Sequence, residues 1–250
     1  MLAAALAAAC SGPARPTPTP APTPPPTTPA DPVPPVEQPP APNTLTDAER
    51  AAGWRLLFDG QTTAGWRGFR RSDLPVGWRA IGGALTRDGA AGDAITTEEF
   101  ANFELAIEWQ IVEGGNSGVM YRVSETASEL TFFSGPEMQV IDNARNPDGG
   151  TALSSAGACY DMYAPSSDVA HPPGAWNLAR IVASGAHIEH WLNGVKVVEY
   201  ELGSADWLAR KEKSIFREVP TYGREPRGHI ALQDHGERVA YRSIKIRPLS

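Results

Sequence analysis

Three polar residues, Gln233, Asp234 and His235, end an apolar segment near the C-terminus. An amide, a carboxylate and an imidazole in succession can hold a polar substrate and exchange protons with it near neutral pH. Strands that only fill a core seldom end in this way. The stretch ALQDHGERVAYRSIKI (231–246) therefore predicts two strands joined by a tight turn, with candidate site residues at the end of the first.

Side-chain alternation predicts which other polar residues could join them. In PEMQVIDN, Glu137 and Gln139 share one face of a strand, opposite Met138 and Val140. The same period turns Gln233 and His235 to one face and leaves Asp234 behind or beside His235. The residues expected to line one polar cleft are Glu108, Asn116, Arg122, Glu137, Gln139, Gln233 and His235.

Simpler interpretations exist for each candidate. Glu108, or the Glu137 and Gln139 pair, could be solvated strand residues, and Asp234 could be a local turn cap. His187 and His190 precede a hairpin, and we interpret them as surface or interface residues. Cys159 has no second thiol nearby, which favours a buried structural thiol over a nucleophile.

Short strands are expected to position these residues. Period-two patterns predict strands at 102–112, 119–123, 137–142, 177–184, 187–192, 196–202, 229–234 and 239–246. Asn193-Gly194 predicts a two-residue hairpin turn. Thr46 and Glu49 have capping-box spacing for one short helix, and Ser204 is the expected N-cap of another. Many short strands with few helices predict an all-β antiparallel sandwich or barrel. The core is expected to contain Leu105, Ile107, Trp109, Val119, Val140, Leu232 and Ile244.

The N-terminal part of the chain is expected to lie outside this fold. Residues 1–10 resemble a bacterial lipoprotein signal with cleavage before Cys10 and lipid on its thiol. A plain secretory signal is the alternative. Residues 11–43 are a Pro-rich linker that cannot bury enough apolar surface to fold, and 44–250 form the domain. Ser11 favours the outer membrane, so we expect a protein on its periplasmic side, or a soluble periplasmic one.

Composition excludes some classes of partner. The net charge of −7 argues against nucleic acid, because surfaces that follow phosphates concentrate Lys and Arg. No apolar run reaches the ~18 residues that a membrane-spanning helix needs. The expected contact with a membrane is therefore through the lipid anchor alone, and the residues by themselves indicate only a polar cleft of a size suited to a small carbohydrate.

Several motifs in order resemble one known family. The motifs are LFDGQTTAGW, FELAIEW, GNSGVMYR, PEMQVIDN, GAWN, HWLNGVKVVEYEL and GHIALQDHGERVAYRSIKIRPL. Together they are similar to the 3-keto-disaccharide hydrolase family over residues ~50–249. The resemblance implies a concanavalin-like jelly roll of two antiparallel sheets. It also implies action on glycosides oxidised to a ketone at carbon 3, as a lyase, a hydratase or a net hydrolase.

The implied chemistry assigns roles to the candidates. His235 would be the base or acid with Asp234 orienting it, Glu137 would be the alternative base, and Arg122, Gln139 or Gln233 would contact the enolate or hydroxyls. No cofactor is certain, although a cleft of Glu, Asp and His could also hold a divalent metal. Two other functions stay open. One is a non-catalytic sugar-binding module, and the other is an ordinary glycosidase with Glu108 and Glu137 on either side of the scissile bond.

Overall fold

The computed structural model describes residues 40–249 of the 250-residue chain. The predicted signal, its lipidation site Cys10 and most of the Pro-rich segment lie outside the described residues. Within residues 40–249, none of the helices is both long and apolar enough to cross a membrane.

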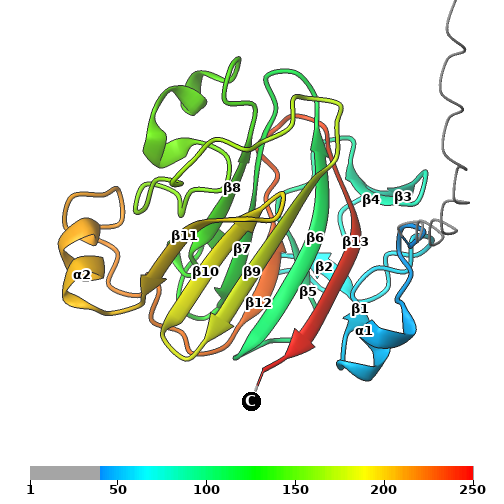
Figure 1. Ribbon diagram of the computed structural model, residues 1–250, viewed down its shortest axis with the longest axis horizontal. Coiled ribbons are helices and arrows are strands. Elements are labelled where there is room, and N and C mark those ends of the chain that lie inside the picture. The colour runs from blue at the N-terminus through cyan, green and yellow to red at the C-terminus, as the bar shows by residue number, and fades with distance from the viewer. Residues whose placement is uncertain (1–39, 250) are drawn as a thin grey trace, which may run out of the picture. The chain divides into compact units, whose positions relative to one another are not determined.

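The described residues form two antiparallel sheets that pack face to face, the jelly-roll sandwich predicted from the sequence (Figure 1). The larger sheet contains, in spatial order, β11 (Val195–Glu201), β10 (His187–Leu192), β9 (Asn177–Ser184), β6 (Phe103–Ile111), β13 (Val239–Pro248), β4 (Ala84–Arg87) and β3 (Trp78–Ile81), and β1 (Arg55–Leu56) also pairs with β13. The smaller sheet contains β2 (Trp66–Gly68), β5 (Ala94–Thr96), β12 (His229–Leu232), β7 (Asn116–Val123) and β8 (Glu137–Ile141).

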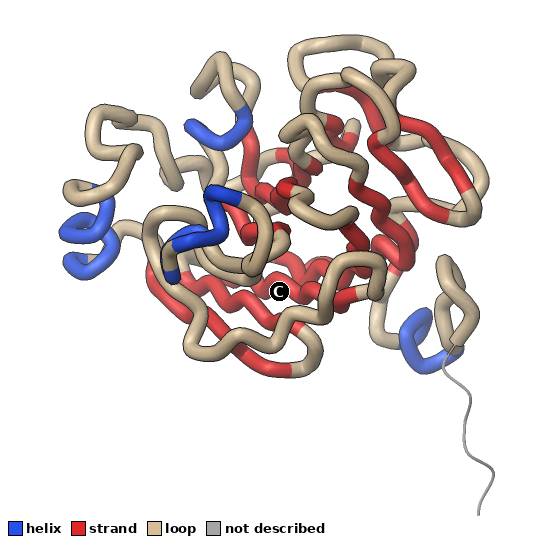
Figure 2. The backbone as a smooth tube through the Cα atoms, turned by 90° about the horizontal axis from the view of Figure 1, so that it is seen from above, coloured by secondary structure: helices blue, strands red, loops and turns tan. Residues whose placement is uncertain are grey.

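Helical elements are short and lie outside the sheets (Figure 2). They are α1 (Asp47–Ala51), α2 (Ala205–Lys211) and the 3-10 turns η1 (Thr131–Phe133), η2 (Pro147–Gly150) and η3 (Ala152–Ser154). The predicted caps are confirmed: Thr46 and Glu49 form a capping box on α1, and the Ser204 hydroxyl accepts from Trp207 N at the start of α2. Asn193 and Gly194 both have positive φ, as the predicted hairpin turn between β10 and β11 requires.

One core fills the space between the sheets. All seven residues predicted for it are buried there, because alternate side chains of each strand point to the same face. Cys159 is fully buried as predicted, and burial raises the pKa of its thiol to about 12. His190 contradicts the prediction of a surface residue. It is fully buried, bonded to Tyr121 Oη and Gly157 O, and burial lowers its pKa to about 4.

Residues 231–246, which contain Gln233, Asp234 and His235, connect the two sheets. β12 belongs to the smaller sheet and β13 to the larger one, so the two predicted strands exist but do not pair with each other. The chain crosses between the sheets within residues 233–238. This crossing places the polar residues after β12 at an edge of the sandwich, where they can face a site rather than the core.

Candidate functional site

The outer face of β7 and β8, away from the core, carries the floor of the site. Gly118 lies opposite Gln139, and Met120 lies opposite Glu137 in the register of the two strands. Val119 and the alternate residues of β8 point inward to the core. Glu137 and Gln139 therefore share the outer face, as the alternation predicts.

The end of β12 adds two more predicted residues. Gln233 N donates to Gly118 O over 3.0 Å, and Ser117 Oγ donates to Gln233 O over 2.7 Å. These bonds extend the pairing with β7 by one residue before the chain crosses to the other sheet. Gln233 and His235 are thereby held beside Glu137 and Gln139.

Loops cover this face and form a cleft of about 300 Å³. Its lining residues are Asn116, Phe132, Glu137, Gln139, Asp148, Tyr160, Ile215, Gln233 and His235. Five of the residues predicted for one cleft therefore meet in it. Phe132, Asp148, Tyr160 and Ile215 complete the walls. Sequence reasoning did not select these four, because they lie on loops or helical turns where side-chain alternation carries no information.

Glu137 is the most perturbed acid of the cleft. Its side chain is almost completely buried, and burial, followed by the nearby charge of Asp93, raises its pKa to about 8. With its amide nitrogen turned toward β7, Gln139 donates to Ser117 O over 2.9 Å and to Glu137 Oε1 over 3.1 Å. At neutral pH Glu137 is thus mostly a protonated carboxyl group that can give its proton to a ligand.

Asp93 is a half-buried carboxyl near Glu137. It accepts from Asp234 N over 2.8 Å and from the Thr131 hydroxyl, and burial raises its pKa. Because this group lies near Glu137, any negative charge it carries adds to the cost of ionising Glu137. Asp93 was not among the predicted residues, since it follows Gly92 in a loop with no strand pattern.

His235 is the accessible imidazole of the cleft, with 42% of its side chain exposed. Its Nε2 is 4.0 Å from Asp148 Oδ2, and its Nδ1 is 3.6 Å from Glu237 Oε2. The carboxylates that flank the imidazole are therefore those of Asp148 and Glu237.

Asp234 does not orient His235, contrary to the prediction. It forms an ion pair with Arg87 and accepts from Ala91 N over 2.9 Å and Gly92 N over 2.7 Å. Burial alone would raise the pKa of Asp234, but these two backbone donors and Arg87 lower it below its usual value. Asp234 anchors the crossing segment to the loop before β5 and is not part of the cleft lining.

Two further predicted residues lie elsewhere. Glu108 lies on β6 in the larger sheet and pairs with Arg242, whose guanidinium stands 4.1 Å from the Trp176 ring centroid. Its strand belongs to the opposite layer, so Glu108 and Glu137 cannot flank one scissile bond as an ordinary two-carboxylate glycosidase would need. Side-chain alternation along a strand does not show which of the two sheets that strand joins.

Arg122 is displaced by a bulge in β7. Ala231 pairs with Met120 but His229 pairs with Val123, so Tyr121 and Arg122 together oppose the single residue Ile230. Arg122 adopts φ +54°, a region that residues other than glycine seldom enter. The extra residue ends the regular alternation, and Arg122 lines a different hollow.

The predicted divalent metal stays a prediction. In the cleft, His235 and Asp148 supply an imidazole and a carboxylate, and Asn116 Oδ1 is buried without a hydrogen-bond partner. These donor types suit a divalent cation, and Asn116 Oδ1 could equally accept from a sugar hydroxyl.

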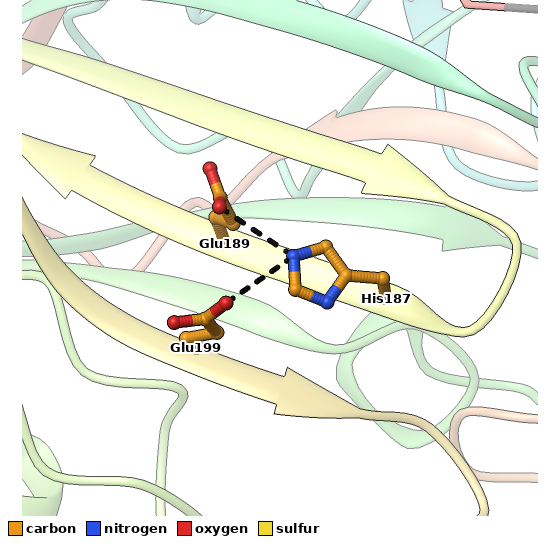
Figure 3. A group of neighbouring side chains, drawn as sticks. All are labelled: His187, Glu189 and Glu199. Carbon is orange, nitrogen blue, oxygen red and sulfur yellow. Dashed lines mark hydrogen bonds and ion pairs between the residues drawn. The ribbon is translucent and has the colours of Figure 1, made fainter.

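A second group of possible metal ligands lies on the larger sheet. His187 Nε2 is 3.5 Å from carboxylate oxygens of both Glu189 and Glu199 (Figure 3). Lys196 Nζ lies 3.3 Å from Glu189 and 2.6 Å from Glu199, so an ammonium already pairs with both carboxylates. We interpret this group as an ion-pair network along β10 and β11.

The fold and site define a β-sandwich whose outer sheet face holds a polar, sugar-sized cleft with a protonated carboxyl group. The sequence model of the 3-keto-alpha-glucoside-1,2-lyase-like domain matches residues 53–247, and the chain belongs to this family.

Known relatives agree with this assignment. A 3-keto-disaccharide hydrolase of Bacteroides thetaiotaomicron is 33% identical over an alignment of 190 residues, with coverage of 67% of this chain and 66% of that protein. This chain thus spans about two thirds of the length of that relative. A crystal structure of a candidate glycosyl hydrolase from Parabacteroides distasonis covers 84% of this chain and 100% of its own, with a TM-score of 0.80 and 34% identity.

A second candidate glycosyl hydrolase from the same organism has a TM-score of 0.61 and 26% identity, and covers 78% of this chain and 99% of its own. The family and these relatives place the chain among carbohydrate-processing proteins.

Proposed function

We propose that the protein cleaves 3-keto-glycosides by 1,2-elimination and subsequent hydration, which together amount to hydrolysis. The observation that carries this proposal is Glu137, a buried carboxyl group with a pKa of about 8 in a cleft of about 300 Å³ lined by amides and an imidazole. The family match and the named hydrolase support the same substrate class.

The ketone at carbon 3 makes the proton on carbon 2 acidic. A base removes that proton, and the electron pair forms an enolate. The enolate collapses to a carbon 1–carbon 2 double bond as the bond from carbon 1 to the glycosidic oxygen breaks. The departing oxygen takes a proton from a general acid. Water then adds its hydroxyl to carbon 1 and a proton to carbon 2, and no oxidant or reductant is consumed.

Each step needs a group that the cleft contains. Glu137 holds a proton at neutral pH and serves as the acid for the departing oxygen. His235 has an accessible imidazole and serves as the base at carbon 2. The amides of Asn116, Gln139 and Gln233 offer donors and acceptors to the sugar hydroxyls and to the enolate oxygen.

The test compares 3-keto-trehalose and 3-keto-sucrose with the unoxidised disaccharides. We expect the wild type to release free sugar from the keto compounds alone. In deuterated water, early product should carry deuterium on carbon 2 beyond that acquired in buffer, because elimination removes the original proton. Cleavage of the unoxidised sugars would instead indicate an ordinary glycosidase. Binding of either sugar without cleavage would indicate a non-catalytic module.

A further inference from the structure

A second hollow, larger than the cleft, lies against α2. Its volume is about 480 Å³, and it is lined by Arg122, 185–186, 202–203, parts of α2 and 222–226. Figure 1 shows α2 beyond the β11 edge of the larger sheet. The apolar part of its wall comes from Leu202, Trp207 and Leu208.

The charged residues of this hollow are mostly cationic. Arg122, Lys211 and Arg224 line it with a single carboxylate, that of Glu225. Arg122 is 4% exposed and Lys211 is 9% exposed. Within residues 40–249, none of the three forms an ion pair with a carboxylate, whereas Arg67 and Arg180 have carboxylate partners.

Arg122 keeps part of its hydrogen-bonding capacity unused. Its Nε and Nη2 donate to Ala101 O over 3.0 and 2.8 Å, and its Nη1 has no partner among the described residues. Lys211 Nζ likewise has no acceptor among them. Burial and, after it, the neighbouring Arg224 lower the pKa of Lys211, while the charge of Glu212 acts in the opposite direction.

Arg122 and Lys211 are largely buried, whereas Arg224 is exposed. Taking an ammonium or guanidinium out of water is unfavourable unless an opposite charge compensates it. The chain as a whole has a net charge of −7, so the positive charge of this hollow is opposite in sign to the net charge of the protein. We propose that the hollow around Arg122, Lys211 and Arg224 binds a small organic anion through its carboxylate or phosphate group.

The proposed anion site is separate from the cleft but shares one segment with it. The chain after α2 contributes Ile215 to the cleft and residues 222–226 to the anion site. Gly223 N also donates to Ser134 O, next to the η1 turn that carries Phe132 of the cleft. The two sites therefore use different side chains, and the anion site can be altered without touching the proposed catalytic groups.

The test measures binding of inorganic phosphate and D-glucuronate to the full chain by calorimetry and thermal shift at low ionic strength, with glucose as the neutral control. A probe concentration of about 10 mM would saturate a site of about 1 mM affinity. Binding of phosphate alone would assign the site to phosphate groups, and binding of glucuronate alone to carboxylates. Each of these results supports the proposal.

Charge-removing variants locate the site. Lys211→Gln with Arg224→Gln should weaken binding about 10–100-fold, because two charged donors are lost. Lys213→Gln removes one positive charge from an exposed residue outside the hollow, and this variant should bind the probes as the wild type does. If the double variant unfolds, the binding measurement uses Arg224→Gln alone, because Arg224 is exposed and its replacement should not disturb the fold. Absence of binding to both probes, or equal affinity in the charge-removing and Lys213→Gln variants, would overturn the proposal.

Discussion

Glu137 shows how the surroundings of one residue set its chemistry. Its strand neighbours place it on the outer face of the smaller sheet, but loops then bury it, and Asp93 adds a second carboxyl nearby. Both effects disfavour the charged form, so the group keeps its proton well above the ordinary value of 4.5. A protonated carboxyl at neutral pH is the form that a general acid requires.

The pH dependence of turnover tests this role. We expect the rate on a 3-keto-glycoside to fall as the pH rises through about 8, because Glu137 then loses the proton it donates. Glu137→Gln should lower the rate by ~10²–10⁴ and remove this alkaline limb. A pH–rate profile of both proteins provides the measurement. A wild-type rate that instead increases through pH 8 would show that Glu137 acts as a base.

The free energy of unfolding should also depend on the protonation of Glu137. The folded carboxyl binds a proton more tightly than the unfolded one, so the free energy of unfolding should decrease as the pH rises from about 4.5 to about 8. Glu137→Gln cannot ionise and should lack this contribution, gaining stability relative to the wild type at pH 8. Urea unfolding of both proteins at pH 5 and pH 8 measures the difference. An equal pH response in both would contradict the raised pKa.

His235 and Gln139 should differ in the size of their effects. His235→Ala removes the proposed base and should lower turnover by ~10²–10⁴, whereas Gln139→Ala removes a positioning contact and should cost less. Glu108→Gln is the control, because Glu108 lies in the opposite sheet and pairs with Arg242. Steady-state kinetics on a 3-keto-glycoside compares the three. Full activity of both the His235 and the Glu137 variants would refute the assignment.

Side-chain alternation predicted several residues that line the cleft but not all of their neighbours. Alternation selects Glu137, Gln139 and His235 because it states which side chains share a face of one strand. It cannot state which sheet a strand joins, and so it placed Glu108 wrongly. Asp148 and Asp93 were not predicted, because loops bring them near the site and residues in loops show no periodic pattern in the sequence.

At the scale of elements, the fit between β7 and β8 determines where Glu137 lies. A Cβ atom on Gly118 would be 1.9 Å from Glu137 Oε1, far inside contact distance. The carboxyl group therefore occupies the space that any other residue at position 118 would fill. Glycine is needed here for close approach of a side chain and not for an unusual backbone angle.

Replacing this glycine should damage the site more than the fold. Gly118→Ala is expected to push the Glu137 carboxyl out of position and lower turnover by at least about tenfold, as misplaced catalytic groups commonly do. Gly150→Ala is the matched control, since nothing lies within 4 Å of its added Cβ and its φ is not in the glycine-favoured region. Kinetics and thermal unfolding of both variants test the prediction. Unchanged kinetics for Gly118→Ala would contradict it.

The long strands were predictable, whereas the short strands between Arg55 and Thr96 were not. β6, β9 and β10 each extend over six to nine residues, enough for alternation to be visible. The five strands between Arg55 and Thr96 contain two to four residues each, too few to show a period. The bulge at Arg122 was not predicted for a related reason. One inserted residue changes the face to which the neighbouring side chains of the strand point, and the amino-acid composition does not reveal it.

At the scale of the whole molecule, the predicted arrangement of the chain includes a part that the structure does not describe. We propose that Cys10 carries a lipid and that the Pro-rich segment tethers the sandwich to the periplasmic side of the outer membrane. Cys10→Ser should leave the membrane fraction while the domain keeps its thermal unfolding transition. Cys159→Ala is the control and should stay with the membrane, because that thiol is buried. Fractionation and immunoblotting measure the partition, and a membrane-bound Cys10→Ser protein would contradict the proposal.

The bulge in β7 has a consequence for how this protein can change over evolutionary time. Upstream of the bulge the strand supplies Asn116 and Gly118 to one site, and at the bulge it supplies Arg122 to another. The two sites thus use different residues of this strand. Selection could refine the specificity of the cleft and of the proposed anion site independently, although a single strand of eight residues serves both.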